Sequence, residues 1–325
     1  MRIPCWIKKG ISLKDYTTFK IGGKASYFAE ISEKGKLIKT LKWAKEHSLP
    51  FFILGNGSNV LFSDKGYRGI IIKIQNSKFK IQNNSIKVGA GLLLVDFLTK
   101  CVKNNLSGFE WMAGIPGTIG GAVYGNAGAF GWEVKDFFKW AKTINPKTFQ
   151  EKIYSFKQCR FGYRESIFKK SKNKNDIKEI IWEVALKIRK GEKKDIQEKI
   201  NGYLEHKIRQ GMFKYPSAGS VFKNILIKDT PYYNFYNPRS ETINIKGEEA
   251  TVKKGKISAG WFIEKCGLKE KRSGGAKISD FHANLIVNFN KAKAKDILFL
   301  IKFIKKKVFE KFKIKLEEEI MVLSP

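Results

Sequence analysis

The stretch AGIPGTIGGAVYGNAG, from Ala113 to Gly128, holds six glycines in sixteen residues, with one proline and no charged side chain. Glycine-rich turns expose backbone N–H groups, permit positive φ, and let a phosphate approach without meeting a Cβ atom. A shorter stretch, GNGSN from Gly55 to Asn59, follows the apolar run PFFIL and has the same character. A diphosphate held between two lobes needs donors from both sides, so the two stretches together predict such a cradle. On composition alone, a purely structural loop remains the alternative.

A dinucleotide-binding fold is the first hypothesis that the shorter stretch raises, because Gly55-x-Gly57 follows an expected strand. The fuller pattern requires a third glycine, an apolar helix that opens directly behind it, and an acidic residue further on. Val60 occupies the position of the third glycine, and neither the helix nor a suitable acid follows. The sequence therefore does not predict a fold of that kind.

The formal net charge of +33 suggests a nucleic-acid-binding function, because clustered basic residues neutralise phosphates. Only eight of the 63 basic residues are arginines, and the lysines are spread along the whole chain. Nucleic-acid recognition favours arginine forks and localised basic faces. The pattern indicates a solvated lysine surface that attracts anionic substrates, and a basic nucleic-acid-binding protein is kept as the alternative from a different class.

The four cysteines of this 325-residue chain are far apart, with no CxxC pair and no histidine cluster, so we expect reduced thiols and no metal site. The N-terminal segment MRIPCWIKKG lacks an apolar signal core, and lysines interrupt the late apolar run ILFLIKFIKKK. We therefore expect a cytoplasmic location and no membrane association. The length predicts about two domains.

Periodic segments divide the chain. A helix capped by Ser32, a hairpin at FKIQNNSIKV and a helix at LLLVDFLTKCVKNNL are predicted before the longer glycine stretch. Asp195 and Glu198 resemble a capping box that opens the helix IQEKINGYLEHKIRQ. We place a domain boundary there, giving a first region 1–195, with lobes of about 1–75 and 76–195, and a second region 196–325.

The end of the chain predicts a long lysine-striped helix over about 293–312 and a final strand, KIKLEEEIMVL. Strict alternation along that strand places Glu318 on the same face as Leu316 and Ile320. The pattern alone thus favours Glu318 as the buried acid.

Several motifs, taken in order, resemble the UDP-N-acetylenolpyruvoylglucosamine reductase family over roughly residues 15–320. The resemblance implies an α+β chain: an FAD-binding fold of the vanillyl-alcohol-oxidase type in two lobes, and a C-terminal α+β substrate domain whose last strand returns to the active site. The motifs are TTFKIGGKASYF, ILGNGSNVLFSD, AGIPGTIGGAVYGNAG, CRFGYRES, PSAGSVFKN, GLKEKRSGGAKIS, HANLIVN and LEEEI.

The resemblance assigns both glycine stretches to FAD, and the absence of histidine from them predicts that FAD is bound noncovalently. It implies that the cofactor is held by Gly55, Asn56, Gly57, Ser58, Asn59, Gly114, Ile115, Pro116, Gly117, Thr118, Gly120, Gly121, Asn126, Ala127 and Gly128.

The implied activity is NADPH-dependent reduction of the enolpyruvyl double bond of UDP-N-acetylenolpyruvoylglucosamine to UDP-N-acetylmuramate, a peptidoglycan precursor, with the hydride supplied by flavin N5. NADPH would use the pocket before the substrate does, which agrees with the lack of a separate dinucleotide motif. A UDP-sugar is the expected small-molecule partner, and no obligatory protein partner is evident. Another FAD oxidoreductase of the same fold, acting on a hydroxy acid or a sugar, is the runner-up.

Three catalytic residues follow from the resemblance. Arg164 in FGYRES polarises the substrate carboxylate, Ser220 in PSAGS donates a proton, and Glu319 is the active-site acid, with Glu318 in place of the usual proline. Without the resemblance, Arg164 and Ser220 would be interpreted as surface and turn residues. Neither a histidine nor an aspartate lies at the spacing of a nucleophile elbow, so a hydrolase triad is not predicted.

Substrate binding is expected from Lys223, Asn224 and Asn284, and Lys223 could also stabilise the alkoxide of the serine. His282, in the same motif as Asn284, is interpreted at least as readily as a structural histidine. Besides Glu318, two further departures from the family pattern stand out: Ile225 replaces a common proline, and an unusually long insert runs to about 257. The short spacing between Arg164 and Ser220 resembles the subgroup that lacks an extra tyrosine-bearing loop.

Overall fold

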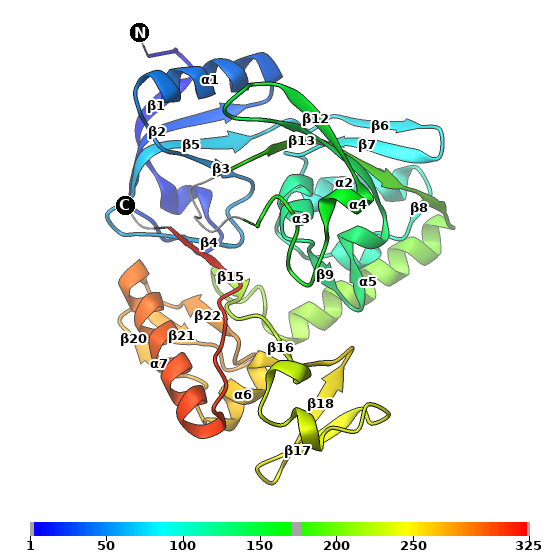
Figure 1. Cartoon of the computed structure of the whole chain (residues 1–325), viewed down its shortest axis with the longest axis vertical. Coiled ribbons are helices and arrows are strands. Elements are labelled where there is room, and N and C mark those ends of the chain that lie inside the picture. The colour runs from blue at the N-terminus through cyan, green and yellow to red at the C-terminus, as the bar shows by residue number, and fades with distance from the viewer. Residues whose placement is uncertain (1–2, 171–176, 324–325) are drawn as a thin grey trace.

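The computed structural model describes residues 3–170 and 177–323, and Figure 1 shows a two-lobed N-terminal half above a C-terminal domain. The first lobe is built around β5, whose isoleucines are buried on both faces. Continuous β-branched sequence is typical of a covered parallel strand, and β5 pairs in parallel with β2 and β3. The sheet order is β1-β2-β5-β3, with β1 Ile7–Ser12, β2 Lys24–Ile31, β3 Phe51–Leu54 and β5 Tyr67–Ile74.

Helix α1 (Lys34–Glu46) packs against this sheet through the residues that the sequence pattern singled out. Leu37, Leu41 and Ala44 are buried in the same core as the isoleucines of β5. The predicted cap is wrong by one residue, because Glu33 rather than Ser32 precedes the first turn, and no side chain caps it. The helix is therefore held by its apolar face.

The second lobe is a five-stranded antiparallel sheet with the order β12-β11-β13-β7-β6. The predicted hairpin is confirmed, and Asn83 adopts the left-handed conformation, with φ of 48°, that a tight turn requires. The strands are β6 Phe79–Gln82, β7 Ser85–Gly89, β11 Phe138–Ile144, β12 Glu151–Ser155 and β13 Ile180–Lys187. Two short pairs complete the lobe: β8 Leu106–Ser107 with β14 Arg189–Lys190, and β9 Gly128–Ala129 with β10 Trp132–Glu133.

Among the described residues of the second lobe, the α-helices are α2 Leu94–Lys103, α3 Ile119–Tyr124, α4 Phe156–Cys159 and α5 Lys193–Arg209. Helix α5 begins before the predicted capping box, because Glu192 is its N-cap residue. Ile196 and Ile200 of α5 are buried in the core that the two lobes share. Packing therefore places this helix with the first region, and the predicted boundary at 195 lies one helix too early.

The C-terminal domain contains two four-stranded antiparallel sheets around a separate core. One sheet has the order β15-β22-β21-β20, with β15 Ser217–Ser220, β20 Arg272–Ser273, β21 Ala276–Ile278 and β22 Leu285–Asn288. The other has the order β16-β19-β18-β17, with β16 Ile225–Leu226, β17 Thr242–Ile245, β18 Glu248–Lys253 and β19 Lys256–Ile257. Helices α6 (Ala259–Lys265) and α7 (Ala294–Phe312) pack on this core, and α7 confirms the predicted late helix. Within the described ranges, none of the helices combines the length and the apolar character that a membrane crossing requires.

A strand pairing and a helix cap are among the contacts that join the C-terminal domain to the first lobe. The last strand, β23 (Met321–Leu323), leaves the C-terminal domain and pairs in parallel with β4 (Val60–Phe62), as the red segment in Figure 1 shows. Asp64, just beyond β4, accepts hydrogen bonds from the backbone amides of Ala294 and Lys295 at 2.8 and 3.1 Å. A carboxylate of the first lobe thus caps the first turn of α7.

Replacing Asp64 tests this cap. Asp64→Ala leaves two helix amides without their acceptor and removes a negative charge from the positive end of the helix dipole, so we expect the free energy of unfolding to fall by about 1–2 kcal/mol. Urea denaturation measures the loss, and hydrogen exchange at Ala294 and Lys295 localises it. Asp15→Ala is the matched control because Asp15 is an exposed carboxylate of the same lobe. Equal stability of the two variants would show that the cap contributes nothing.

Candidate active site

The two glycine stretches face each other across the N-terminal half. The loop between β3 and β4 carries Gly55 to Asn59, and the Asn56 side-chain amide donates to the carbonyl of Pro116 at 2.8 Å. A Cβ atom on Gly55 would lie 2.7 Å from Thr118 Oγ1. The close approach of the second stretch therefore explains the glycine at position 55.

Free backbone amides line the shorter loop. Among the described residues, no acceptor is bonded to the amides of Asn56, Gly57, Ser58 or Asn59, although Gly57 is buried. A run of such amides forms a concave anion site. Gly57 has φ of 63°, and a Cβ atom there would overlap the carbonyl of Tyr16 at 2.0 Å. Unpaired donors and bare backbone fit the diphosphate of FAD.

In the longer stretch, some residues leave space for a ligand and others pack against the protein. Thr118 caps α3 by accepting from the amide of Gly121 at 3.2 Å, and a Cβ atom on Gly117 would meet nothing closer than 3.5 Å. Gly120, in contrast, packs on Ala90, where a Cβ atom would come within 2.8 Å of the Ala90 Cβ. Its glycine thus serves the packing of α3.

Asn126 is also structural. It is fully buried, its side-chain amide donates to the carbonyl of Gly162 at 2.9 Å, and its Oδ1 accepts from the amide of Lys135 at 3.1 Å. Both polar groups of the side chain are therefore bonded within the protein, which gives Asn126 a positioning role, and its direct contact with FAD stays a prediction. Asn126 fixes the turn that carries Arg164.

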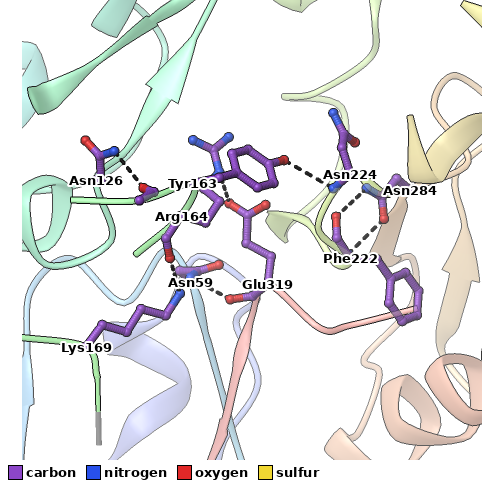
Figure 2. A network of polar contacts seen from close by, with 10 residues as sticks. Asn59, Asn126, Tyr163, Arg164, Lys169, Phe222, Asn224, Asn284 and Glu319 are labelled. Carbon is purple, nitrogen blue, oxygen red and sulfur yellow. Dashed lines mark hydrogen bonds and ion pairs between the residues drawn. The ribbon is translucent and has the colours of Figure 1, made fainter. Parts of the chain in front are cut away.

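Arg164 and Glu319 meet at the junction of the two halves, as Figure 2 shows. Arg164 Nε lies 2.7 Å from Glu319 Oε1 in an ion pair that lacks hydrogen-bond geometry. Arg164 has φ of 56°, an uncommon value for a side-chain-bearing residue. The amine of Lys169 donates to its carbonyl at 3.0 Å and helps to hold this conformation. The two predicted groups are thus brought together from distant parts of the chain.

The backbone around Glu319 explains why alternation selected the wrong acid. Residues 314–320 do not form the predicted regular strand, and only Met321–Leu323 pair as β23. Glu318 turns to Lys305 at 3.0 Å, whereas Glu319 points to Arg164. The prediction of Glu318 from the pattern is wrong, and the acid that the resemblance selected is the one beside Arg164.

Ser220 is the last residue of β15, where a bulge redirects the strand. Ser217 pairs with Val287 and Ser220 with Leu285, so one extra residue is accommodated between them. Gly219 has φ of 71°, which only glycine adopts at little cost. The half-buried hydroxyl of Ser220 makes no hydrogen bond to any residue that the structure describes.

Asn284 differs from its expected role. Only 2% of it is exposed, and its amide pairs with both the N–H and the carbonyl of Phe222, at 2.9 and 2.8 Å. Asn284 therefore positions the segment that follows Ser220, and its contact with the substrate stays a prediction. His282 Nδ1 accepts a hydrogen bond from the backbone N–H of Asn284 at 3.2 Å, which fits the interpretation of His282 as a structural histidine.

Lys223 and Asn224 lie at the edge of the same site. The amine of Lys223 pairs with Glu317, so part of its charge is compensated within the protein. The backbone amide of Asn224 donates to the hydroxyl of Tyr163 at 3.2 Å, which joins the C-terminal domain to the residue before Arg164 (Figure 2). The sequence analysis assigned Tyr163 no role, because a tyrosine beside a motif arginine carries no signal of its own.

Two lysines that the sequence did not single out have altered acidity. Burial first, and the charge of Lys223 second, lower the pKa of Lys169. Burial alone lowers the pKa of Lys207 from 10.5 to about 8. Lys207 is 6% exposed, and its amine donates to the carbonyl of Ala113, at the start of the longer glycine stretch, at 2.6 Å. Positive charge is therefore placed beside both the junction and the cradle.

Residues 25–148 match the family model for an FAD binding domain, so the half that carries both glycine loops is that of an FAD-containing oxidoreductase. Residues 211–323 match the family model described as UDP-N-acetylenolpyruvoylglucosamine reductase, C-terminal domain. The second match begins two residues beyond α5, in agreement with the packing of that helix in the first core.

Similar proteins cover almost the whole chain. The UDP-N-acetylenolpyruvoylglucosamine reductase of Alkaliphilus oremlandii is 36% identical over 314 residues, which are 96% of this chain and 91% of the relative. That of Caldicellulosiruptor saccharolyticus is 38% identical over 315 residues, 95% of this chain and 89% of the relative. The crystal structure of the Thermus caldophilus reductase superposes with a TM-score of 0.74 at 30% identity, covering 97% of this chain and 99% of that one.

The chain belongs to the UDP-N-acetylenolpyruvoylglucosamine reductase family. The predicted fold class, with an FAD-binding region of the vanillyl-alcohol-oxidase type and an α+β C-terminal domain, is confirmed. So is the prediction of an FAD-containing enzyme.

Gly55→Ala tests the cradle. The added methyl group would sit 2.7 Å from Thr118 Oγ1 and push the two loops apart, so we expect FAD affinity to fall by at least tenfold. Titration of the apoprotein with FAD, followed by flavin fluorescence, measures the change. Gly202→Ala on α5 is the control, because a Cβ atom there meets nothing within 4 Å. Unchanged affinity in Gly55→Ala would show that the loops do not hold FAD.

Lys207 predicts a pH dependence of stability. The unfolded chain holds this proton up to pH 10.5 and the folded chain only to about pH 8, so the folded state carries its full penalty below pH 8 and regains stability as the pH rises between these values. At about 1.4 kcal/mol per pKa unit, the penalty is on the order of 3 kcal/mol. Lys207→Met removes it, so the stability advantage of the variant over the unmodified chain should shrink from pH 8 to pH 10.

Urea denaturation at several pH values measures that difference. Lys199→Met is the control, because Lys199 is exposed on the same helix. A stability difference between Lys207→Met and the unmodified chain that stays constant across the range would show that Lys207 keeps an ordinary pKa when folded.

Proposed function

We propose that this chain reduces UDP-N-acetylenolpyruvoylglucosamine to UDP-N-acetylmuramate with electrons from NADPH. One observation carries the proposal: the Arg164–Glu319 ion pair lies where Asn59 of the FAD loop and Val221, next to Ser220, both bond to the backbone of Glu319. The amide of Glu319 donates to the carbonyl of Val221 at 2.7 Å, and the side-chain amide of Asn59 donates to the carbonyl of Glu319 at 3.1 Å. The cofactor loop, a cation, an acid and a serine therefore converge.

FAD, when bound, supplies the hydride that the terminal carbon of the enolpyruvyl group accepts. The protein must then stabilise the negative charge that passes into the substrate carboxylate. Arg164 does so as a preorganised cation, and the partly buried junction strengthens its effect. Its ion pair with Glu319 keeps the guanidinium oriented before the substrate enters.

Ser220 donates the proton that completes the reduction at the neighbouring carbon. A hydroxyl is a weak acid, so this role requires positive charge nearby that stabilises the alkoxide. Lys223, three residues further on, and Lys169, whose pKa responds to the charge of Lys223, belong to the same group of cations. Glu319 balances part of the positive charge of this group, and its ion pair with Arg164 holds the guanidinium in place.

NADPH and the UDP-sugar would use one pocket in succession, because the chain lacks a separate dinucleotide motif. The product is a precursor of peptidoglycan, and the expected location of the enzyme is the cytoplasm.

Ser220→Ala separates the two half-reactions. The variant keeps the flavin cradle, so reduction of bound FAD by NADPH should proceed at nearly the normal rate. Reoxidation by the enolpyruvyl nucleotide should slow by about 10²–10⁴-fold, because the proton donor is lost. Stopped-flow absorbance of the flavin follows both steps.

Ser217→Ala is the control, since Ser217 lies in the same strand and its hydroxyl accepts only a long 3.4 Å bond from Gly219. A parallel loss of both half-reactions in Ser220→Ala would contradict the proton-donor role. Reoxidation of the unmodified enzyme by oxygen but never by the enolpyruvyl nucleotide would overturn the proposed substrate.

A further inference from the structure

The insert between Asn224 and Ser258 is an ordered part of the C-terminal domain. It forms the sheet β16-β19-β18-β17, and six of its apolar residues are buried in the core of that domain. These residues are Ile227, Ile243, Ile245, Ala250, Val252 and Ile257. The insert therefore has a fixed position relative to the site.

The turn between β18 and β19 reaches across to the FAD-binding half. Lys254 has φ of 52°, and its amine donates to the carbonyl of Gly131, in the turn of the β9–β10 hairpin, at 2.7 Å. In Figure 1 the end of β18 points towards that hairpin. The insert thus closes one side of the junction that holds Tyr163 and Arg164.

Lys256, beside this turn, lies directly over Tyr163. The register pairs Lys256 with Leu226, two residues beyond Asn224, and its Nζ is 4.0 Å from the centroid of the Tyr163 ring. The Tyr163 hydroxyl already accepts a hydrogen bond from the backbone N–H of Asn224. The cation, which Figure 2 does not draw, therefore lies against the Tyr163 ring of the network shown there, although it comes from the insert.

Lys256 forms no ion pair with a carboxylate of the described residues, and Glu133 attracts it only from a distance. Burial is the largest cause that lowers its pKa; the charge of Glu133 comes next and raises it, and the smaller effects of Arg164, Lys254 and Lys135 lower it further. Glu133 itself pairs with Lys135 at 2.6 Å, and no carboxylate of a described residue lies within ion-pair distance of Lys256. Arg164 and Lys223, in contrast, each have a glutamate partner. Holding a half-buried cation among like charges costs free energy that an anionic ligand would recover.

We propose that Lys256, supplied by the insert, binds the diphosphate of the UDP-sugar substrate. The inference rests on the proposed function. Arg164 is committed to the carboxylate end of that substrate, so the two negative charges of the diphosphate need a second cation. The Tyr163 ring holds the ammonium group from one side without consuming its three N–H donors. A compact ammonium with free donors is suited to phosphate oxygens.

NADPH also carries a diphosphate that a lysine could bind. The position of Lys256 and of the segment around Asn224 favours the UDP-sugar as the ligand. Both come from the C-terminal domain, which carries the match to the reductase C-terminal model rather than the match to the FAD domain. The experiment must therefore measure the two ligands separately.

The test uses the FAD-loaded enzyme and compares Lys256→Gln with Lys256→Arg, which keeps the charge, and with Lys253→Gln, an exposed lysine of the same turn. UDP and uridine are titrated by calorimetry. Loss of a charge-assisted contact should weaken UDP binding by about 10- to 100-fold in Lys256→Gln and leave uridine binding unchanged. Lys256→Arg should bind UDP nearly as the unmodified enzyme does, and Lys253→Gln should be unaffected.

Three outcomes would overturn the inference. UDP binding in Lys256→Gln could stay within about twofold of normal, or UDP and uridine could weaken equally, which would indicate a distorted pocket. The concentration of NADPH that half-saturates flavin reduction could rise while UDP binding is unchanged, which would assign the lysine to NADPH. Turnover of the enolpyruvyl nucleotide by the unmodified enzyme is an independent measurement, so failure of the inference is distinguishable from failure of the proposed function.

Discussion

The junction between the two halves depends on the backbone of residues 317–321, which runs between the segment after Ser220 and the first glycine loop. The amide of Glu319 bonds to Val221, and the amide of Met321 bonds to the carbonyl of Asn59 at 2.9 Å. These main-chain bonds fix the backbone on both sides of Glu319, and its side chain extends from there to Arg164. A strand that returns from the far end of the chain therefore couples the cofactor loop to the C-terminal domain, and neither half alone contains the site.

The same constraint explains the unusual backbone of Arg164. A left-handed conformation costs a side-chain-bearing residue about 1–2 kcal/mol and persists only where the surroundings enforce it. Asn126 holds the carbonyl of Gly162, Lys169 holds the carbonyl of Arg164, and Glu319 holds the guanidinium. Three separate segments thus maintain the strained turn, and the cation is already oriented when a substrate arrives. Preorganisation of this kind is the main source of electrostatic catalysis.

The sequence predicted the glycine loops well, since close approach and free amides are local requirements that only glycine-rich sequence meets. It failed where a residue's role depends on distant partners. Alternation selected Glu318 because it assumes a regular strand, whereas bonds to Val221 and Asn59 distort the segment and turn Glu319 to the site. Asn284 looked like a ligand contact, yet Phe222, far away in sequence, uses its whole amide. Helix α5 joined the first core through burial of Ile196 and Ile200, which no boundary signal encodes.

The net charge of +33 illustrates the same distinction between composition and position. Exposed lysines are screened within about 8 Å at physiological salt, so their number affects encounter rates more than recognition. A buried lysine with acidic partners, such as Lys277 at 3.6 Å from Asp280, is balanced within the fold. Lys207, which is buried, and Lys256, which is half-buried, differ, because neither has a carboxylate at ion-pair distance among the described residues. Lys207 lies beside the cofactor cradle and Lys256 beside Tyr163. The desolvation cost of these two charges therefore falls at positions where an anionic ligand would offset it.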